Sequence, residues 1–302
     1  MFVDDMLREM GTGKDVIYEL LLNDSPQLAK LMLKKYPLIQ RITDHFPTTK
    51  ANYNRDSNNG HPKAFLRHGF FTGAYSMKGI GAALEGYGVN NRQYNFMRGL
   101  WVLTDDLIKE VKEEVDKTGK KVDFIGHSKG GLMGIIASME HPELFRKVVT
   151  LATPFYGSRW ALAFMGIKPL RQMWSGNKRL EKMYKNPLPE EVEYLNMYSL
   201  SDPIINPSEN AILPPRDNVT NVEIKGVGHN GMLYDKRVFI QTRNFIDDHE
   251  IDYDLEHLLT EKGFFSIENL SVPFLKELDN LVLKYLSGVS SLPERLVRRV
   301  RR

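Results

Sequence analysis

Val122-Asp123-Phe124-Ile125-Gly126-His127-Ser128-Lys129-Gly130-Gly131 joins a short apolar segment to a glycine-rich turn, and residues 132–139 continue as a helix of small and apolar side chains. Residues 126–130 match the pattern G-x-S-x-G, which is weak alone and becomes specific between a strand and a helix. The glycines allow a sharp turn that strains the backbone of Ser128 and lifts its hydroxyl clear of the sheet. This context predicts that Ser128 is a nucleophile.

Two other interpretations of the turn remain open. Ser128 can cap the following helix, because serine is a preferred residue at that position. The glycines can also form a phosphate-binding loop at the helix N-terminus. The choice depends on partner residues, since a reactive serine needs a base and the base needs an acid that orients it.

Short apolar strands alternate with helices on both sides of the turn. Residues 48–63 are polar and rich in Asn, and they predict a loop. The alternation predicts an α/β fold, with a mostly parallel sheet and helices on both faces. Strands are predicted over residues 64–69, 122–125, 147–151, 194–200 and 219–225, and helices over residues 91–118, 132–139 and 236–249.

The predicted strands select one base and one acid. In this type of fold the chain order is serine, acid, histidine, and the acid and the base each follow a strand. His229 lies in a glycine-rich loop after strand 219–225, and Asp202 follows strand 194–200. The alternatives are an exposed loop histidine and an aspartate that only makes a turn. Asp217 is a rival acid, but it precedes a strand.

The tetrahedral intermediate of acyl transfer needs backbone N–H groups that point at its oxyanion. The sequence predicts one donor at Lys129, directly after Ser128, and a second at Phe70, in the loop after strand 64–69. We expect His68 to support this loop rather than to react. We expect His127, inside the turn, to point away from the base.

Three regions depart from the alternating pattern. Residues 1–60 predict an N-terminal helical extension to a core of residues 61–249, and residues 250–302 predict a C-terminal one with an amphipathic helix. Residues 157–190 are rich in Trp, Phe and Met and predict a helical cap, which either covers an apolar pocket or only packs on the core. The arginine-rich end of the chain is expected to be solvated or to touch an anionic membrane peripherally.

The composition excludes several classes of function. A net charge of +3 is too small to favour nucleic acid, and the absence of cysteine excludes disulfides, a thiolate nucleophile and cysteine-based metal sites. The N-terminus lacks the features of a signal peptide, and no segment approaches the roughly 18 apolar residues of a membrane span. We therefore expect a cytoplasmic protein without cofactor or metal, although a secreted mature form is also compatible with the sequence.

Four segments resemble bacterial lipases and related α/β-hydrolases: His68-Gly69-Phe70, Gly86-Tyr87-Gly88, residues 125–131, and Leu151-Ala152-Thr153-Pro154-Phe155-Tyr156-Gly157-Ser158. The resemblance runs from about residue 64 to residue 248. It implies the α/β-hydrolase fold and cleavage of carboxylic esters, often of fatty acids, without a cofactor. Phe155 stands where lipases more often have histidine, and Lys129 where they often have Met or Gln.

These features predict a serine hydrolase with a triad of Ser128, His229 and Asp202, acting on a small-molecule or lipid ester through an acyl-enzyme. The same triad also serves acyltransferases, thioesterases and amidases, and the fold also serves as a binding module without catalysis.

Overall fold

The structure is a computed structural model that describes residues 53–57, 60–70, 73–94, 98–159, 161, 171–184, 186–202 and 204–253. The predicted C-terminal extension, with its arginine-rich end, lies almost wholly outside the described residues. The same holds for the N-terminal extension, apart from a few residues after Tyr53. Both extensions stay predictions.

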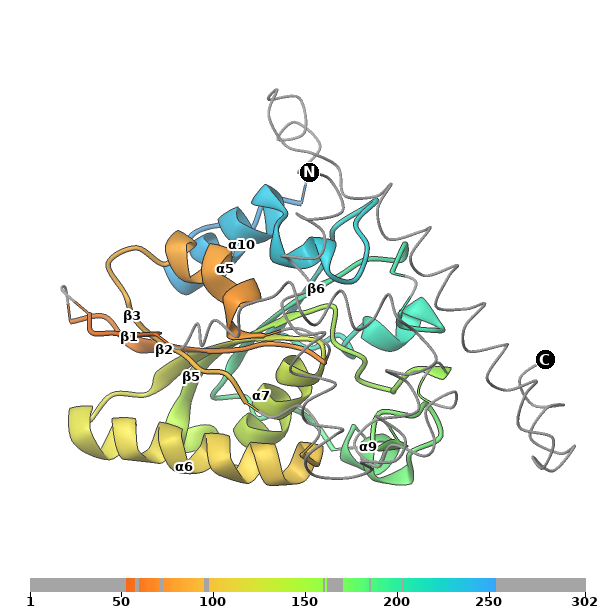
Figure 1. Cartoon of the computed structure of the whole chain (residues 1–302), viewed down its shortest axis with the longest axis horizontal. Helices are drawn as coiled ribbons and strands as arrows, with labels where there is room; N and C mark the ends of the chain where they lie inside the picture. The colour runs from red at the N-terminus through yellow and green to blue at the C-terminus, as the bar shows by residue number, and fades with distance from the viewer. Residues whose placement is uncertain are drawn as a thin grey trace, which may run out of the picture. The chain divides into compact units, whose positions relative to one another are not determined.

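Seven strands among the described residues form one sheet in the order β1-β3-β2-β4-β5-β6-β7 (Figure 1). The edge strand β1 pairs antiparallel with β3, and every other pair of neighbours is parallel. The mostly parallel sheet predicted from the sequence is therefore confirmed. The strands are β1 (Tyr53–Arg55), β2 (Lys63–Arg67), β3 (Gly88–Asn91), β4 (Val122–His127), β5 (Phe145–Leu151), β6 (Glu193–Tyr198) and β7 (Val219–Glu223).

Helices cover both faces of the sheet. Figure 1 shows α5 (Lys78–Ala83) and α10 (Lys236–Ile246) on one face, and α6 (Leu100–Thr118) and α7 (Lys129–Glu140) on the other. Successive side chains of a strand point to opposite faces, so Phe124 of β4 packs in the core under α6 and α7, whereas Ile125 packs in the core under α5 and α10. The remaining elements are α9 (Lys178–Met183) and the 3-10 turns Ala74–Met77, Pro142–Leu144, Ser208–Ala211 and Gly231–Leu233.

The structure corrects one predicted helix and adds elements that the sequence did not predict. The helix predicted over residues 91–118 begins only at Leu100, after Gly99, and Asn91 belongs to β3 instead. Residues 53–55 form the edge strand β1 inside the predicted loop, and their sequence, Tyr-Asn-Arg, lacks the apolar pattern of a buried strand. The short helix α5 was not predicted either.

The described part of the predicted cap packs on the core. Met173 and Leu180 are buried in the same cluster as Phe155 and the residues of α6 and α7. Trp160 and residues 162–170, which hold much of the aromatic and Met content of this stretch, lie outside the described residues. The contacts of this part are therefore those of a segment that packs on the core.

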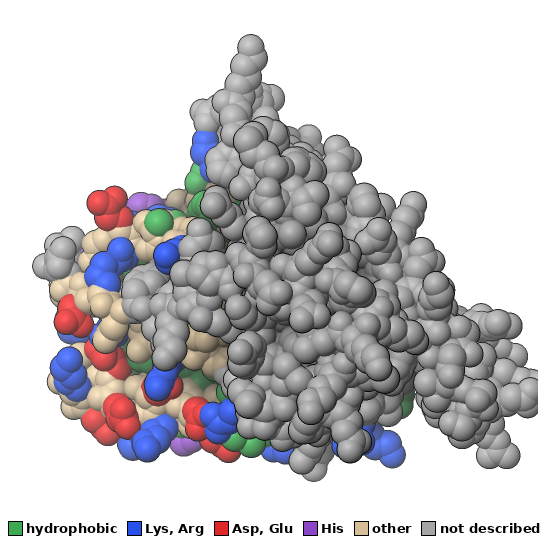
Figure 2. All heavy atoms as spheres, in the orientation of Figure 1, with side chains coloured by type: hydrophobic (Ala, Val, Ile, Leu, Met, Phe, Trp, Pro, Cys, Tyr) green, Lys and Arg blue, Asp and Glu red, His purple; other side chains and the backbone are tan. Residues whose placement is uncertain are grey.

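Basic and acidic side chains are interspersed on the described surface over α6, at the lower left of Figure 2. Glu110 of this helix pairs with Arg67 at 2.7 Å, and Lys112 pairs with Asp116 at 3.9 Å. None of the helices within the described ranges is long and apolar enough to cross a bilayer.

Candidate active site

The serine turn, residues 126–130, connects β4 directly to α7. Ser128 has φ 53° and ψ −117°, a strained conformation that a residue with a side chain rarely adopts. It occupies the N-cap position of α7, yet its side chain makes no capping hydrogen bond. The interpretation of Ser128 as a conventional helix cap therefore has no hydrogen bond to support it.

Two glycines make the serine turn sterically possible. A Cβ on Gly126 would lie 2.5 Å from the carbonyl carbon of Gly130, and a Cβ on Gly130 would collide with the backbone carbonyl of Arg67. Backbone atoms cannot move away as a flexible side chain can, so neither position tolerates even alanine without shifting β2 or α7. The G-x-S-x-G pattern is thus a packing requirement of this turn.

Asp202 and His229 are brought together from loops after β6 and β7. The Nδ1 atom of His229 lies 2.7 Å from Oδ2 of Asp202. The other carboxylate oxygen, Oδ1, accepts from the backbone N–H of Ile204 at 2.7 Å and of Ile205 at 3.2 Å. Because a carboxylate accepts, Nδ1 of His229 carries the hydrogen and Nε2 keeps its lone pair.

Ser128, Asp202 and His229 share one edge of the sheet. They follow β4, β6 and β7, which run parallel, so all three lie where these strands end; we call this the carboxyl edge. All three residues are buried, at 6%, 5% and 7% exposure. The rival acid Asp217 is exposed and precedes β7, at the opposite edge.

The loop after β2 lies beside the serine. A Cβ on Gly69 would be 2.9 Å from Cβ of Ser128. His68 stacks on Tyr94 with ring centres 4.0 Å apart, donates from Nδ1 to the Gly69 carbonyl at 2.8 Å, and accepts at Nε2 from the Tyr94 N–H at 3.3 Å. These contacts suit the neutral ring, and burial lowers the pKa of His68 to about 3. His68 thus supports the backbone that leads to Phe70.

Lys129 follows Ser128, and its side chain is fully buried. Its Nζ donates to the Arg98 carbonyl at 2.8 Å and lies 5.7 Å from the centre of the Phe70 ring. Burial lowers the pKa of this amine to about 7. The predicted oxyanion donors are the backbone N–H groups of Phe70 and Lys129. The side chain of Lys129 reaches the Phe70 ring and so links the two segments that hold these donors.

The prediction that His127 points away from the base is wrong. Its ring centre lies 4.8 Å from that of His229, and its Nε2 lies 3.0 Å from the His229 backbone oxygen. His127 is the last residue of β4, and its side chain points toward the loop after β7. The strand pattern alone could not give this direction, because the strained turn begins at the next residue.

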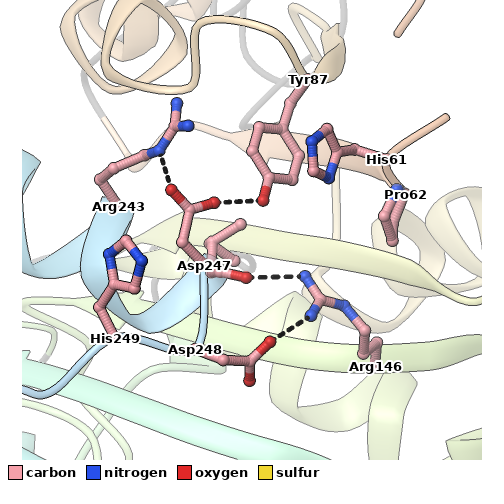
Figure 3. Close-up of a pocket in the computed structure, with 9 residues that line it drawn as sticks. His61, Pro62, Tyr87, Arg146, Arg243, Asp247, Asp248 and His249 are labelled. Atoms are coloured by element: carbon pink, nitrogen blue, oxygen red, sulfur yellow. Dashed lines mark hydrogen bonds and ion pairs between the residues drawn. The ribbon is translucent and has the colours of Figure 1, made fainter. Parts of the chain in front are cut away.

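A second cluster of charged residues lies at the opposite edge, where the parallel strands begin (Figure 3). We call this the amino edge. Its cavity of about 330 Å³ is lined by His61, Pro62, Tyr87, Arg146, Arg243, Ile246, Asp247, Asp248 and His249. Arg243 and Tyr87 both bond to Asp247, while Arg146 donates to the Ile246 carbonyl at 3.1 Å.

The charges of this second cluster are largely paired with one another. Arg146 holds the buried Asp123 carboxylate through two hydrogen bonds of 2.9 Å and 2.7 Å and reaches Asp248 at 3.5 Å. Ligands of open α/β sheets bind at the carboxyl ends of the strands, which is the other edge. Within the described ranges, no group of three or more His, Asp or Glu side chains could hold a metal ion.

Residues 73–182 match a protein family described as "Putative serine esterase (DUF676)". The matched segment contains Ser128 and ends before Asp202 and His229. Phospholipase A(1) LCAT3 of Arabidopsis thaliana is 39% identical over an alignment of 87 residues that covers 26% of this chain and 18% of that protein. The matched segment thus spans less than a fifth of this relative's length.

Solved lipase structures share the fold. Aspergillus fumigatus lipase B superposes with a TM-score of 0.56 at 17% identity, over 67% of this chain and 57% of the lipase chain. A structure from work on LipS and LipT, two metagenome-derived lipolytic enzymes, gives a TM-score of 0.54 at 16% identity, over 67% of this chain and 99% of that chain. At such identities the likeness concerns the fold, and the predicted α/β-hydrolase fold is confirmed.

Proposed function

We propose that this chain, which has the α/β-hydrolase fold and matches a serine esterase family over residues 73–182, cleaves carboxylic esters through an acyl-enzyme on Ser128. The observation that carries the proposal is the pairing of Asp202 with His229 at the edge where the strained serine turn also lies. A carboxylate that fixes the tautomer of a histidine allows this histidine to accept the proton of a serine hydroxyl.

In the first half-reaction, Oγ of Ser128 attacks the ester carbonyl carbon while Nε2 of His229 accepts the hydroxyl proton. The hydrogen bond from Nδ1 to Asp202 holds the ring in the tautomer that keeps Nε2 free to accept. The imidazolium formed in this step is stabilised by the adjacent carboxylate. Collapse of the tetrahedral intermediate breaks the C–O bond, and the alcohol leaves with the proton from His229.

In the second half-reaction, water attacks the acyl-enzyme carbonyl and gives a proton to His229. Collapse of the intermediate then breaks the bond to Ser128, and His229 returns the proton to its Oγ as the carboxylic acid leaves. Both tetrahedral intermediates carry a negative oxygen. We assign its stabilisation to the backbone N–H groups of Phe70 and Lys129, the latter at the N-terminus of α7, where the helix dipole favours negative charge. The reaction requires no metal or organic cofactor.

For the substrate we propose an ester with an apolar acyl group. The support comes from the relatives, since LCAT3 is named a phospholipase A(1) and the similar structures are lipases or lipolytic enzymes. The Trp-, Phe- and Met-rich composition of residues 157–190 fits an apolar acyl group as well. A panel of p-nitrophenyl esters of rising chain length measures the preferred acyl length, and product analysis with a competing alcohol separates hydrolysis from acyl transfer.

The central test is mass spectrometry of the intact chain after exposure to a fluorophosphonate. We expect one adduct, located on Ser128 by peptide mapping, and no adduct in the Ser128→Ala variant. Ser138→Ala is the matched control, because Ser138 is a buried serine of α7 whose hydroxyl contacts the Tyr194 hydroxyl. The control should react like the wild type. A folded wild-type protein that neither reacts nor cleaves any ester of the panel would contradict the proposal.

A further inference from the structure

His127 contacts the loop of the proposed base through a hydrogen bond of defined polarity. Its Nε2 lies 3.0 Å from the backbone oxygen of His229, a residue 102 positions later in the chain. A carbonyl oxygen can only accept, so Nε2 of His127 carries the hydrogen and Nδ1 keeps the lone pair. The ring is fully buried, and burial holds the pKa of His127 well below its ordinary range, so the ring stays neutral.

The other nitrogen of the ring faces the loop after β2. Nδ1 of His127 is buried without a hydrogen-bond partner. A Cβ on Gly69 would lie 2.6 Å from this nitrogen, so the ring and the glycine backbone are in close contact. The imidazole therefore lies between two segments of the site, with one nitrogen toward the loop that leads to Phe70 and the other bonded to the backbone of His229.

His229 is fixed at two points. Its side chain is held at Nδ1 by Asp202, and its backbone is held at the carbonyl oxygen by His127. One contact alone would leave the residue able to pivot, because the surrounding loop contains Gly226, Gly228 and Gly231. Two contacts on opposite ends of the residue define both the ring orientation and the distance of the ring from β4, to which Ser128 is directly attached.

We propose that His127 is a positioning residue that fixes the backbone of His229 relative to Ser128 through the hydrogen bond from its Nε2 to the His229 carbonyl. The inference rests on the proposed function, since it assigns a role within the same site. His127 contacts no reacting atom in this role. Displacement of a reacting group by about 1 Å can lower a rate by about 100-fold, so loss of the hydrogen bond should reduce turnover more than substrate binding.

The competing explanation is that His127 only fills space. Substitutions that keep or remove the hydrogen-bond donor at the position of Nε2 distinguish the two explanations. Glutamine places an amide N–H near the position of Nε2 and keeps the donor. Asparagine reaches only to the position of Nδ1 and loses the donor, and phenylalanine keeps the volume without any donor. A residue that only fills space would give phenylalanine the highest activity of the three, whereas a positioning residue would give it to glutamine.

The experiment measures the rate of fluorophosphonate labelling, together with kcat and KM for p-nitrophenyl butyrate, in the full chain. We expect His127→Asn and His127→Phe to lower the labelling rate and kcat by about 10- to 100-fold, with KM changed less than about threefold. We expect His127→Gln to stay within about fivefold of the wild type. Val149→Ala is the matched control, because Val149 is a buried residue of the adjacent strand β5, and we expect its truncation to lower Tm without touching the site.

The outcomes are distinguishable. Wild-type labelling together with unchanged kcat in His127→Asn would overturn the role of His127 and leave the proposed function intact. Equal losses in His127→Gln and His127→Phe would overturn it as well, because the donor would then be irrelevant. A wild-type protein that is folded and unreactive would overturn the proposed function and with it the role of His127.

Discussion

The two edges of the sheet both gather buried polar side chains, but they use their hydrogen-bonding capacity in opposite ways. At the amino edge, Arg146 donates two hydrogen bonds to the Asp123 carboxylate and one to the Ile246 carbonyl, and Arg243 pairs with Asp247. At the carboxyl edge, Asp202 fixes one nitrogen of His229 and leaves the other with its lone pair. A cluster that saturates its donors and acceptors stabilises the fold, whereas a reactive cluster keeps one position available.

The largest expected effect concerns the acid at the carboxyl edge. Asp202→Asn replaces an acceptor by a group that can donate, which favours the wrong tautomer of His229, and we expect kcat to fall by about 10⁴-fold. The fold should persist, because the asparagine oxygen can still accept from the N–H groups of Ile204 and Ile205.

The control for this variant is Asp217→Asn, in which the rival acid at the other end of β7 is changed. Its kcat should equal that of the wild type, because Asp217 is exposed and remote from the carboxyl edge. A strong loss of kcat in Asp217→Asn, with Asp202→Asn still active, would show that Asp217 at the amino edge is the acid and would contradict the role proposed for Asp202.

The second prediction concerns stability at the amino edge. Arg146→Met leaves the carboxylate of Asp123, which is 0% exposed, without its counter-ion, and we expect a loss of about 3–5 kcal/mol in the free energy of unfolding at pH 7. The kcat of the folded fraction should not change. Lys112→Met is the control, because the exposed pair of Lys112 with Asp116 should contribute no more than about 1 kcal/mol.

The stability of Arg146→Met relative to the wild type should depend on pH in a definite direction. Burial already raises the pKa of Asp123 in the wild type, and loss of the guanidinium raises it further. The folded variant then binds a proton that the unfolded chain releases, so its stability relative to the wild type should increase as the pH falls from 7 toward 5. Denaturant unfolding at several pH values measures the free energy of unfolding of both proteins. A difference between wild type and variant that grows as the pH falls would contradict the prediction.

The smallest expected effect concerns the buried amine at the carboxyl edge. The pKa of Lys129 is lowered to about 7 in the folded protein, against about 10.4 in the unfolded chain. Between these values the unfolded state binds more protons, so wild-type stability should rise with pH by at most about 1.4 kcal/mol per unit. Lys129→Met removes this slope. Parallel unfolding curves for the two proteins between pH 7 and 9 would show that the amine is not desolvated.

The parts of the site that the sequence predicted are those fixed by chain order and strand ends. Ser128 was recognisable because an apolar strand, two glycines and a helix surround it, and the prediction follows from backbone sterics. Asp202 and His229 were selected because each follows a strand, and parallel strands bring their carboxyl ends to one edge. Strands 147–151 and 219–225 were each predicted with an error of two residues at one end, since both contain the β-branched residues typical of strands.

The parts that were missed depend on tertiary contacts. β3 (Gly88–Asn91) has only one apolar residue, and its polar side chains are accommodated by partners such as the Ala74 carbonyl, which accepts from Asn91. The direction of the His127 ring depends on how β4 and the loop after β7 meet, which no local pattern records. The amino-edge pairing of Asp123 with Arg146 was invisible for the same reason, because the two residues lie on separate strands.

The order of strands in the sheet also governs when the site comes into existence. Ser128 lies on a turn that β4 and α7 form locally, whereas Asp202 and His229 are positioned only when β6 and β7 have joined the sheet beyond β5. Such non-local pairings form slowly, because each requires a long segment of chain to be ordered first. A chain that is still folding, or still emerging from the ribosome, therefore has Ser128 without its proposed base. If Ser128 acts as proposed, an unfinished molecule is not acylated, because reactivity requires the last two strands.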